Sequence, residues 1–186
     1  MRIERLRSAF DIQVQITQFP LHPDTPPEGI TLEELFAGRA GRAFDIEAAQ
    51  ERLAGLMRDE GLPYAVRSRT YNSRLAQELA KWAETRPEGP RIHDALFKAY
   101  FVDGVNLADA ERLVEVASSI GLPPQEAREA LESRRYRESV DRDGARSAEL
   151  GVTGVPTFVM NRRGVVGAQP YPALEELVLA AGARHR

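Results

Sequence analysis

The sequence contains no cysteine among its 186 residues. A chain without thiols forms no disulfide bond, carries no cysteine nucleophile and offers no thiolate to a metal ion. Its three histidines are far apart in the sequence and lack the spacing of metal ligands: His22, His93 and His185. We therefore predict that the histidines form no metal site, and that the 186 residues carry out no cysteine chemistry themselves.

Excess positive charge and long apolar runs are also missing. The chain has 25 lysines and arginines against 28 acidic residues, a formal net charge of −3, whereas a general nucleic-acid binder is usually basic. No apolar run approaches the roughly 20 residues of a membrane-spanning helix. Met1 leads directly into a charged amphipathic stretch, in which we recognise no signal peptide. We expect a cytoplasmic protein without nucleic-acid or membrane partners.

What the chain does contain is typical of a globular protein. Hydrophobic residues make up 42% of it and charged residues 28%. A chain of this length can bury a sizeable core, so one compact domain with an insertion is the expected organisation.

The most informative stretch of the sequence runs from Leu150 to Met160. A Gly-Val-Thr-Gly turn precedes Pro156, and the aromatic and β-branched residues that follow at 157–160 predict a buried strand. Because proline cannot donate to a sheet ladder, Pro156 should be the first residue of that strand. An X-Pro bond at a tight turn adopts the cis form at modest cost, and we predict a cis bond between Val155 and Pro156.

The residues after this strand predict a hairpin and a terminal helix. A second short apolar pair, Val165 and Val166, follows residues 161–164, and the glycine in that four-residue connection is typical of a hairpin loop. A helix is predicted over about 171–181.

The start of the chain predicts a helix followed by a strand. Ile3, Leu6 and Phe10 fall at helical spacing. Apolar and polar residues then alternate from Ile12 to Ile16, which predicts a half-buried edge strand over residues 12–19.

Residues 31–150 carry helical start and stop signals. Thr31 and Glu34 form a capping box, Asp45 can cap a helix over 46–60, and Asn72 can cap a helix over 73–85. Further helices are predicted at 91–101, 108–120, 125–133 and 136–150. We therefore divide the chain into a part made of residues 1–30 with 151–186 and a helical insertion, residues 31–150.

Several of these motifs, in this order, resemble one known family. The turn and strand at 151–158, followed by Gly-Ala-Gln-Pro at 167–170, resemble the C-terminal signature of DsbA-like thioredoxin proteins. Further segments fit the same family: residues 19–24, 71–74, 96–101 and 121–123. The branch that looks most similar is the FrnE type, described as polyketide-biosynthesis dithiol–disulfide isomerases.

The resemblance implies an α/β, thioredoxin-like fold of the DsbA type with a large helical insertion. Family members open with a strand and a Cys-x-x-Cys motif at the start of the first helix. Residues 1–7 look like the middle of that helix, so we expect the redox motif upstream of Met1 and the first strand to be missing from this chain. A misassigned gene start is the explanation we favour over a degenerate fragment or a non-redox relative.

The resemblance also implies a substrate-binding turn formed by Gly154, Val155, Pro156 and Thr157. In the family this loop faces the redox motif, and the backbone N–H and C=O of the residue before proline, here Val155, can pair with an extended peptide. The alternative interpretation is a proline that only shapes the turn. Tyr71 and Asn72 could face the same side, although a helix cap is the simpler role for Asn72.

The function implied is that of a thiol–disulfide oxidoreductase or isomerase, inactive in redox chemistry as given because the chain has no cysteine. Its partners would be extended peptide or protein thiol and disulfide substrates, without a cofactor. Two alternatives stay open: an enzyme like the kappa-class glutathione transferases and 2-hydroxychromene-2-carboxylate isomerases, with glutathione held at Pro156, or a non-catalytic holdase. A strand edge left open by the missing first strand would invite self-association, and a homodimer is compatible with this interpretation.

Overall fold

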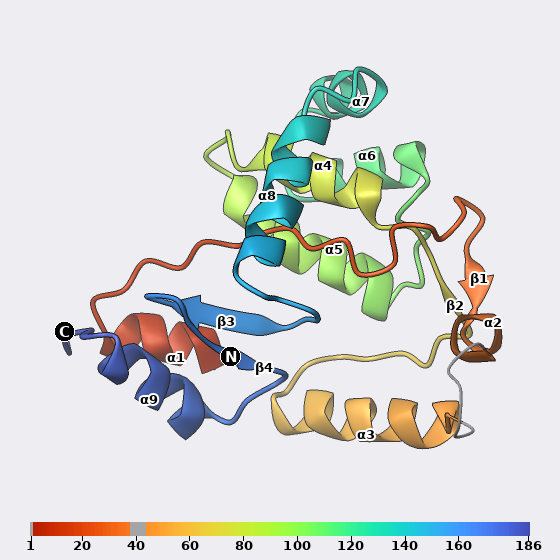
Figure 1. Ribbon diagram of the computed structural model, residues 1–186. Helices are drawn as coiled ribbons and strands as arrows, with labels where there is room; N and C mark the ends of the chain where they lie inside the picture. Colours follow the sequence, from red (N-terminus) through yellow and green to blue (C-terminus); the bar gives the residue numbers. More distant parts are fainter. Residues whose placement is uncertain (1, 38–43) are drawn as a thin grey trace. The chain divides into compact units, whose positions relative to one another are not determined.

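The structure is a computed structural model that describes residues 2–37 and 44–186 (Figure 1). Its contacts divide the chain into two compact units. The sheet unit comprises Met1–Leu21 with Asp141–Arg186, and the helical unit comprises His22–Val140. The division predicted from the sequence placed residues 22–30 with the terminal segments and residues 141–150 in the helical insertion. In the structure, residues 22–30 belong to the helical unit and residues 141–150 to the sheet unit.

The sheet unit is a two-stranded hairpin covered on one face by two helices. Strands β3 (Thr157–Met160) and β4 (Arg163–Val166) pair antiparallel (Figure 1). Helices α1 (Arg2–Ala9) and α9 (Tyr171–Ala180) pack against each other, and α9 also contacts both strands. The buried residues of this core are Leu6 in α1, Phe10 directly after α1, and Leu174 and Val178 in α9. The strand residues Phe158, Met160 and Val165 pack against them. The predicted helices at both ends of the chain are confirmed.

The hairpin turn is tighter than the predicted loop over 161–164. Only Asn161 and Arg162 lie between the strands, with φ values of 48° and 64°. Two central residues with positive φ define a type I′ turn, whose twist matches that of the flanking strands. Arg163 and Gly164 therefore already belong to β4, opposite Met160 and Val159.

The prediction of a strand over residues 12–19 is wrong. This segment carries no regular secondary structure, and Val14 and Ile16 are 43% and 44% exposed. The alternation of apolar and polar residues stabilises a strand only where a neighbour completes its backbone hydrogen bonds. None of the described residues forms a ladder with this segment. It is held instead by contacts such as the Gln18 amide donating to the Asp143 carboxylate at 2.9 Å.

The helical unit is built around four helices that pack on one core. They are α4 (Arg74–Ala83), α5 (Ile92–Phe101), α6 (Ala110–Ser119) and α7 (Pro124–Glu132), with a 3₁₀ turn, Gly89–Arg91, before α5. The side chains fully buried between them are large and apolar: Leu79, Trp82, Ile92, Leu113 and Leu122. Helix α8 (Arg137–Glu149) follows and leads to β3.

Two short strands and two further helices occupy the start of the helical unit. Strands β1 (Ile30–Thr31) and β2 (Arg69–Thr70) pair antiparallel, and helices α2 (Leu32–Ala37) and α3 (Ile46–Asp59) lie between them in the sequence. The sequence predicted only helix from Thr31 onward, because strands of two residues are too short to show a period of two. None of the described helices is long and apolar enough to cross a membrane.

The predicted caps of α2 and α3 are confirmed. The Thr31 hydroxyl accepts from the Glu34 amide at 3.1 Å, and the Glu34 carboxylate accepts from the Thr31 amide at 2.7 Å, which completes a capping box. The Asp45 carboxylate accepts from the Ala48 amide at 2.9 Å. Helix α4 begins one residue later than predicted, with Ser73 as its N-cap residue.

Asn72 has a wider role than the cap predicted for it. Its side-chain oxygen accepts from the Arg74 amide at 2.9 Å, at the start of α4. Its side-chain nitrogen donates to the carbonyls of Pro23 and Thr25 at 3.0 and 2.8 Å. Asn72 therefore fixes the proline-rich loop to the first turn of α4.

Candidate substrate-binding site

The turn that leads into β3 begins at the C-terminal end of α8. The Gly151 amide donates to the Ala148 carbonyl at 2.9 Å and the Val152 amide to the Ser147 carbonyl at 2.9 Å. This pair of bonds, with Gly151 at a φ of 69°, is a Schellman motif. Glycine adopts this conformation without the steric cost that a Cβ would add, so the chain leaves α8 in a defined direction toward residues 154–157.

The predicted site residues lie together in this turn, and three of them are tied to it by hydrogen bonds. The Thr157 hydroxyl donates to the Gly154 carbonyl at 2.6 Å. The Pro156 carbonyl accepts from the Gly167 amide at 2.8 Å, which adds one row to the ladder between β3 and β4. The bond between Val155 and Pro156 is cis, the isomer predicted from the sequence.

Val155 differs from its three neighbours. The residue is 49% exposed, and no described residue hydrogen-bonds its backbone N–H or C=O. A peptide N–H and C=O that face solvent in an extended region can accept a further strand. The backbone of Val155 can therefore pair with an added strand, which is the role that the family resemblance implies for it.

The hairpin register extends this open edge along β3. Rows of an antiparallel ladder alternate between hydrogen-bonded and non-hydrogen-bonded pairs. Since Pro156 and Gly167 form a hydrogen-bonded row, Thr157 and Val159 lie in rows whose N–H and C=O point away from β4. None of the described residues pairs with them on that side. Sequence reasoning missed Val159, because this alternation depends on a register that the turn sets.

The hairpin also exposes one apolar face. Phe158 and Val165 pack on the helices, so the alternating residues of the same strands face the other way. Val159 is 40% exposed and Val166 is 58% exposed. A strand added beside β3 would extend this valine face as well as the ladder.

The turn and β3 contain no ionisable side chain from Leu150 to Met160. They offer no general acid, general base or activated nucleophile, and the only reactive atoms are two threonine hydroxyls. One of these, in Thr157, already donates within the turn. These residues can bind and orient a partner, and they cannot carry out a covalent step by themselves.

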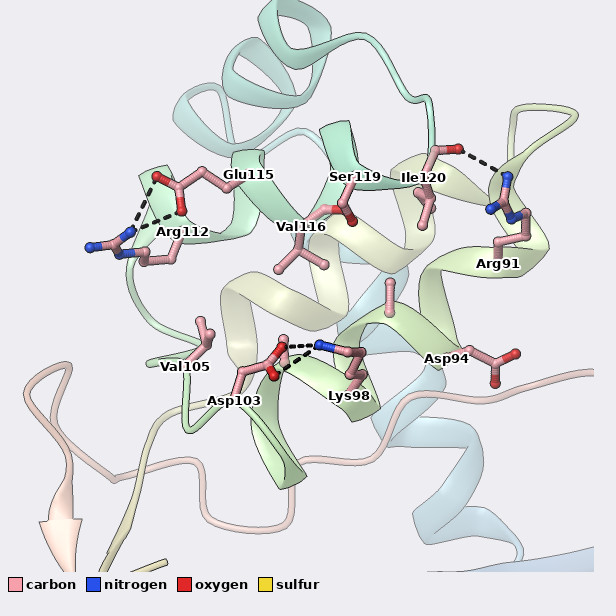
Figure 2. A pocket seen from close by; sticks show the side chains of 12 residues that line it. Arg91, Asp94, Lys98, Asp103, Val105, Arg112, Glu115, Val116, Ser119 and Ile120 are labelled. Atoms are coloured by element: carbon pink, nitrogen blue, oxygen red, sulfur yellow. Dashed lines mark hydrogen bonds and ion pairs between the residues drawn. The ribbon is translucent and has the colours of Figure 1, made fainter. Parts of the chain in front are cut away.

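A groove of about 500 Å³ between α5 and α6 is a second candidate (Figure 2). Two ion pairs lie in its lining: the Lys98 ammonium is 2.6 Å from the Asp103 carboxylate, and the Arg112 guanidinium is 2.9 Å from Glu115. The other two charged side chains of the lining, Arg91 and Asp94, have opposite signs. Because the lining carries no net formal charge, we place the candidate site at the turn.

The most buried charge in the helical unit has a structural role. Glu78 is 1% exposed and accepts from the guanidinium groups of Arg74 and Arg134, each at 2.8 Å. Burial acts to raise the pKa of Glu78, but the hydrogen bonds from Arg134 and Arg74 outweigh it and hold that pKa below its ordinary value. The carboxylate therefore clamps α4 to the turn that follows α7.

His93 and His185 each have other neighbours than metal ligands. His93 lies in α5 with its Nε2 atom 3.9 Å from Glu84, and burial lowers the pKa of His93. His185 packs against the Phe10 ring. Within residues 2–37 and 44–186 no group of three or more possible ligands is placed to hold a metal ion.

Comparison with known proteins connects this geometry to one family. A family model described as a DSBA-like thioredoxin domain matches residues 1–179. The structure is similar to that of a probable DsbA oxidoreductase from Streptomyces coelicolor, with 31% identity, a TM-score of 0.86 and coverage of 98% of this chain and 83% of that one. A solved 2-hydroxychromene-2-carboxylate isomerase shares the fold, with a TM-score of 0.60, 20% identity and coverage of 80% and 73%.

A curated relative is more distant. The uncharacterized Bacillus subtilis protein YwbO is 29% identical over 106 residues, which are 56% of this chain. The match spans about half, 52%, of the length of that protein. Together, the family model and the Streptomyces structure confirm the predicted α/β, thioredoxin-like fold of the DsbA type with a large helical insertion.

Proposed function

The chain belongs to the family of DSBA-like thioredoxin domains, and we propose that it uses the open edge of β3 to bind extended segments of thiol and disulfide substrates. The observation that carries this proposal is Val155, an exposed residue beside Pro156 whose backbone N–H and C=O are hydrogen-bonded by no described residue. Thr157 and Val159 continue the same edge. A peptide that pairs with them would be held in one register beside the turn.

The chemistry of the family is thiol–disulfide exchange. A thiolate attacks one sulfur of a disulfide, a mixed disulfide forms, and the other sulfur leaves as a thiolate. Because the 186 residues contain no cysteine, their part in such a reaction is to bind and orient the substrate. We further propose that the activity is of the FrnE type, which the motifs at residues 71–74 and 167–170 support. We also propose that the protein acts in the cytoplasm.

The proposal predicts that binding depends on the open-edge N–H groups of β3. Val159→Pro removes one of them without removing a hydrogen bond to β4, because Val159 lies in a row that points away from that strand. The matched control is Val166→Pro, which removes an N–H from the outer edge of β4. Both positions hold exposed valines in the same hairpin.

Fluorescence anisotropy measures the binding directly. The probe is a labelled peptide of alternating valine and threonine around one cysteine, with lysine at both ends. We expect Val159→Pro to weaken binding roughly tenfold or more, since at least one hydrogen bond is lost and the proline ring obstructs the edge. Equal affinity of both variants and the unaltered chain would refute the proposal. Displacement of the probe by glutathione but not by unlabelled peptide would favour the glutathione-dependent alternative instead.

A further inference from the structure

We infer that Arg2 is a positioning residue for the turn at 154–157. Its guanidinium holds the loop at residues 167–169, and that loop in turn holds the Pro156 carbonyl. The inference rests on the proposed function, because it assigns a residue that orients the turn where substrate binds. All of these contacts lie within the sheet unit.

The first link joins α1 to the loop that precedes α9. The Arg2 Nη1 atom donates to the Gln169 carbonyl at 2.8 Å and to the Ala168 carbonyl at 3.1 Å. Hydrogen bonds from a charged donor are stronger than those between neutral groups. The bond to Gln169 is also partly buried, so water competes for it less than at an exposed position. Arg2 thus connects the first turn of α1 to residues near the other end of the chain.

The second link lies inside the loop. The Gln169 amide donates to the Gly167 carbonyl at 2.8 Å, and the Gln169 side chain donates to the Val166 carbonyl. Gly167 has a φ of 91°, a conformation that a residue with a Cβ rarely adopts. These bonds make residues 166–169 one compact unit, so a side chain that holds the Gln169 carbonyl also restricts Gly167.

The third link reaches the turn. The Gly167 amide donates to the Pro156 carbonyl at 2.8 Å, and on the other side the Thr157 hydroxyl donates to the Gly154 carbonyl at 2.6 Å. Val155 lies between these two fixed carbonyls, which therefore restrict the direction of its backbone N–H and C=O. The Thr157 bond is internal to the turn, whereas the Gly167 bond comes from the loop. A shift of the loop would move the Pro156 carbonyl and with it the Val155 peptide group.

Arg5 provides a matched control on the same helix. Its guanidinium lies over the Tyr171 ring in α9, 4.0 Å from the ring centroid. Arg2→Met and Arg5→Met each remove one positive charge and one long side chain from α1. A property that changes in the first variant and not in the second depends on the loop contact, and not on net charge.

Two measurements test the inference. Fluorescence anisotropy with the valine–threonine peptide measures binding, and NMR follows the exchange rate of the Gly167 amide and the resonance of the Val155 amide. We expect Arg2→Met to weaken peptide binding roughly fivefold or more, to speed exchange of the Gly167 amide and to shift the Val155 resonance, because the loop is released. Arg5→Met should leave all three close to those of the unaltered chain.

Arg2→Lys is the conservative variant. Its ammonium group keeps the charge and can donate to the Gln169 carbonyl, but it lacks the planar geometry of a guanidinium. We expect its peptide affinity and its Gly167 exchange to lie between those of Arg2→Met and the unaltered chain. Circular dichroism gives the temperature below which every variant is folded, and both measurements are made there.

Three results would overturn the inference. They are an unchanged Gly167 exchange rate in Arg2→Met, equal changes in Arg2→Met and Arg5→Met, and faster Gly167 exchange with unchanged peptide affinity. Failure of the unaltered chain to bind the peptide would instead refute the proposed function. The two NMR measurements would then still decide whether Arg2 positions the turn.

Discussion

The Pro156 carbonyl accepts a hydrogen bond from the Gly167 amide at 2.8 Å, one row beyond the last paired residues of β3 and β4. This bond determines which residues of β3 face β4 and which face outward, because rows of an antiparallel ladder alternate. It follows that Thr157 and Val159 present their peptide groups on the open side. The proposed substrate site rests on that alternation.

Thr157→Val should loosen the turn while preserving its shape. The substitution removes the hydroxyl that donates to the Gly154 carbonyl at 2.6 Å and keeps a β-branched side chain. We expect the free energy of unfolding to fall by about 0.5–1.5 kcal/mol, the usual net value of one hydrogen bond. The control is Thr153→Val, at an exposed position, which should change little. Urea unfolding of both variants checks this, and equal stabilities would show that the bond contributes nothing.

Gly89→Ala should destabilise the helical unit strongly. A Cβ at residue 89 would lie 1.8 Å from the Ala83 carbonyl oxygen, a distance that only movement of the backbone could relieve. We expect a loss of about 1–3 kcal/mol from this overpacking. Gly55→Ala, inside α3, meets nothing closer than 4.0 Å and should stabilise by roughly 0.5–1 kcal/mol through helix propensity. Thermal unfolding compares them, and a neutral Gly89→Ala would contradict the close approach.

Glu78→Gln should cost stability at neutral pH and less in acid. The folded pKa of Glu78 lies below its value of about 4.3 in an unfolded chain, so the carboxylate contributes stability above pH ~4.3 and loses it as the pH falls through the folded pKa. We expect a deficit of about 1–3 kcal/mol at pH 7, because two guanidinium groups lose a charged acceptor. The deficit should shrink in denaturant titrations below that pH.

The control for this titration is Glu111→Gln. Glu111 pairs with Arg128 at 2.7 Å on the surface, where its side chain is 66% exposed, and such pairs contribute little. A deficit for Glu78→Gln that stays constant from neutral to acid pH would show that the charge of Glu78 does not stabilise the fold.

The features predicted correctly from the sequence are those set by near neighbours. The capping box of Thr31 and Glu34, the cap formed by Asp45, and Pro156 at the entry to a strand each depend on residues within one turn of chain. The family motifs likewise located the turn over 154–157. Its role in binding substrate is a prediction that the peptide measurements test.

The features that were missed depend on distant partners or on uncommon backbone conformations. Residues 12–19 alternate like a strand, but alternation does not supply the neighbour that a ladder requires. Asn161 and Arg162 form a type I′ turn, although its second residue is usually glycine. Because that turn fixes the register, the outward direction of Val159 could not be read from the sequence.

Amide hydrogen exchange at single-residue resolution tests the open edge most directly. In a dilute sample without peptide, we predict slow exchange for the amides of Phe158 and Met160, which face β4, and fast exchange for those of Thr157 and Val159. Saturating peptide should slow the Thr157 and Val159 amides and leave the other two nearly unchanged. If the Thr157 and Val159 amides are protected without peptide, or stay fast when peptide is bound, β3 is not the binding edge.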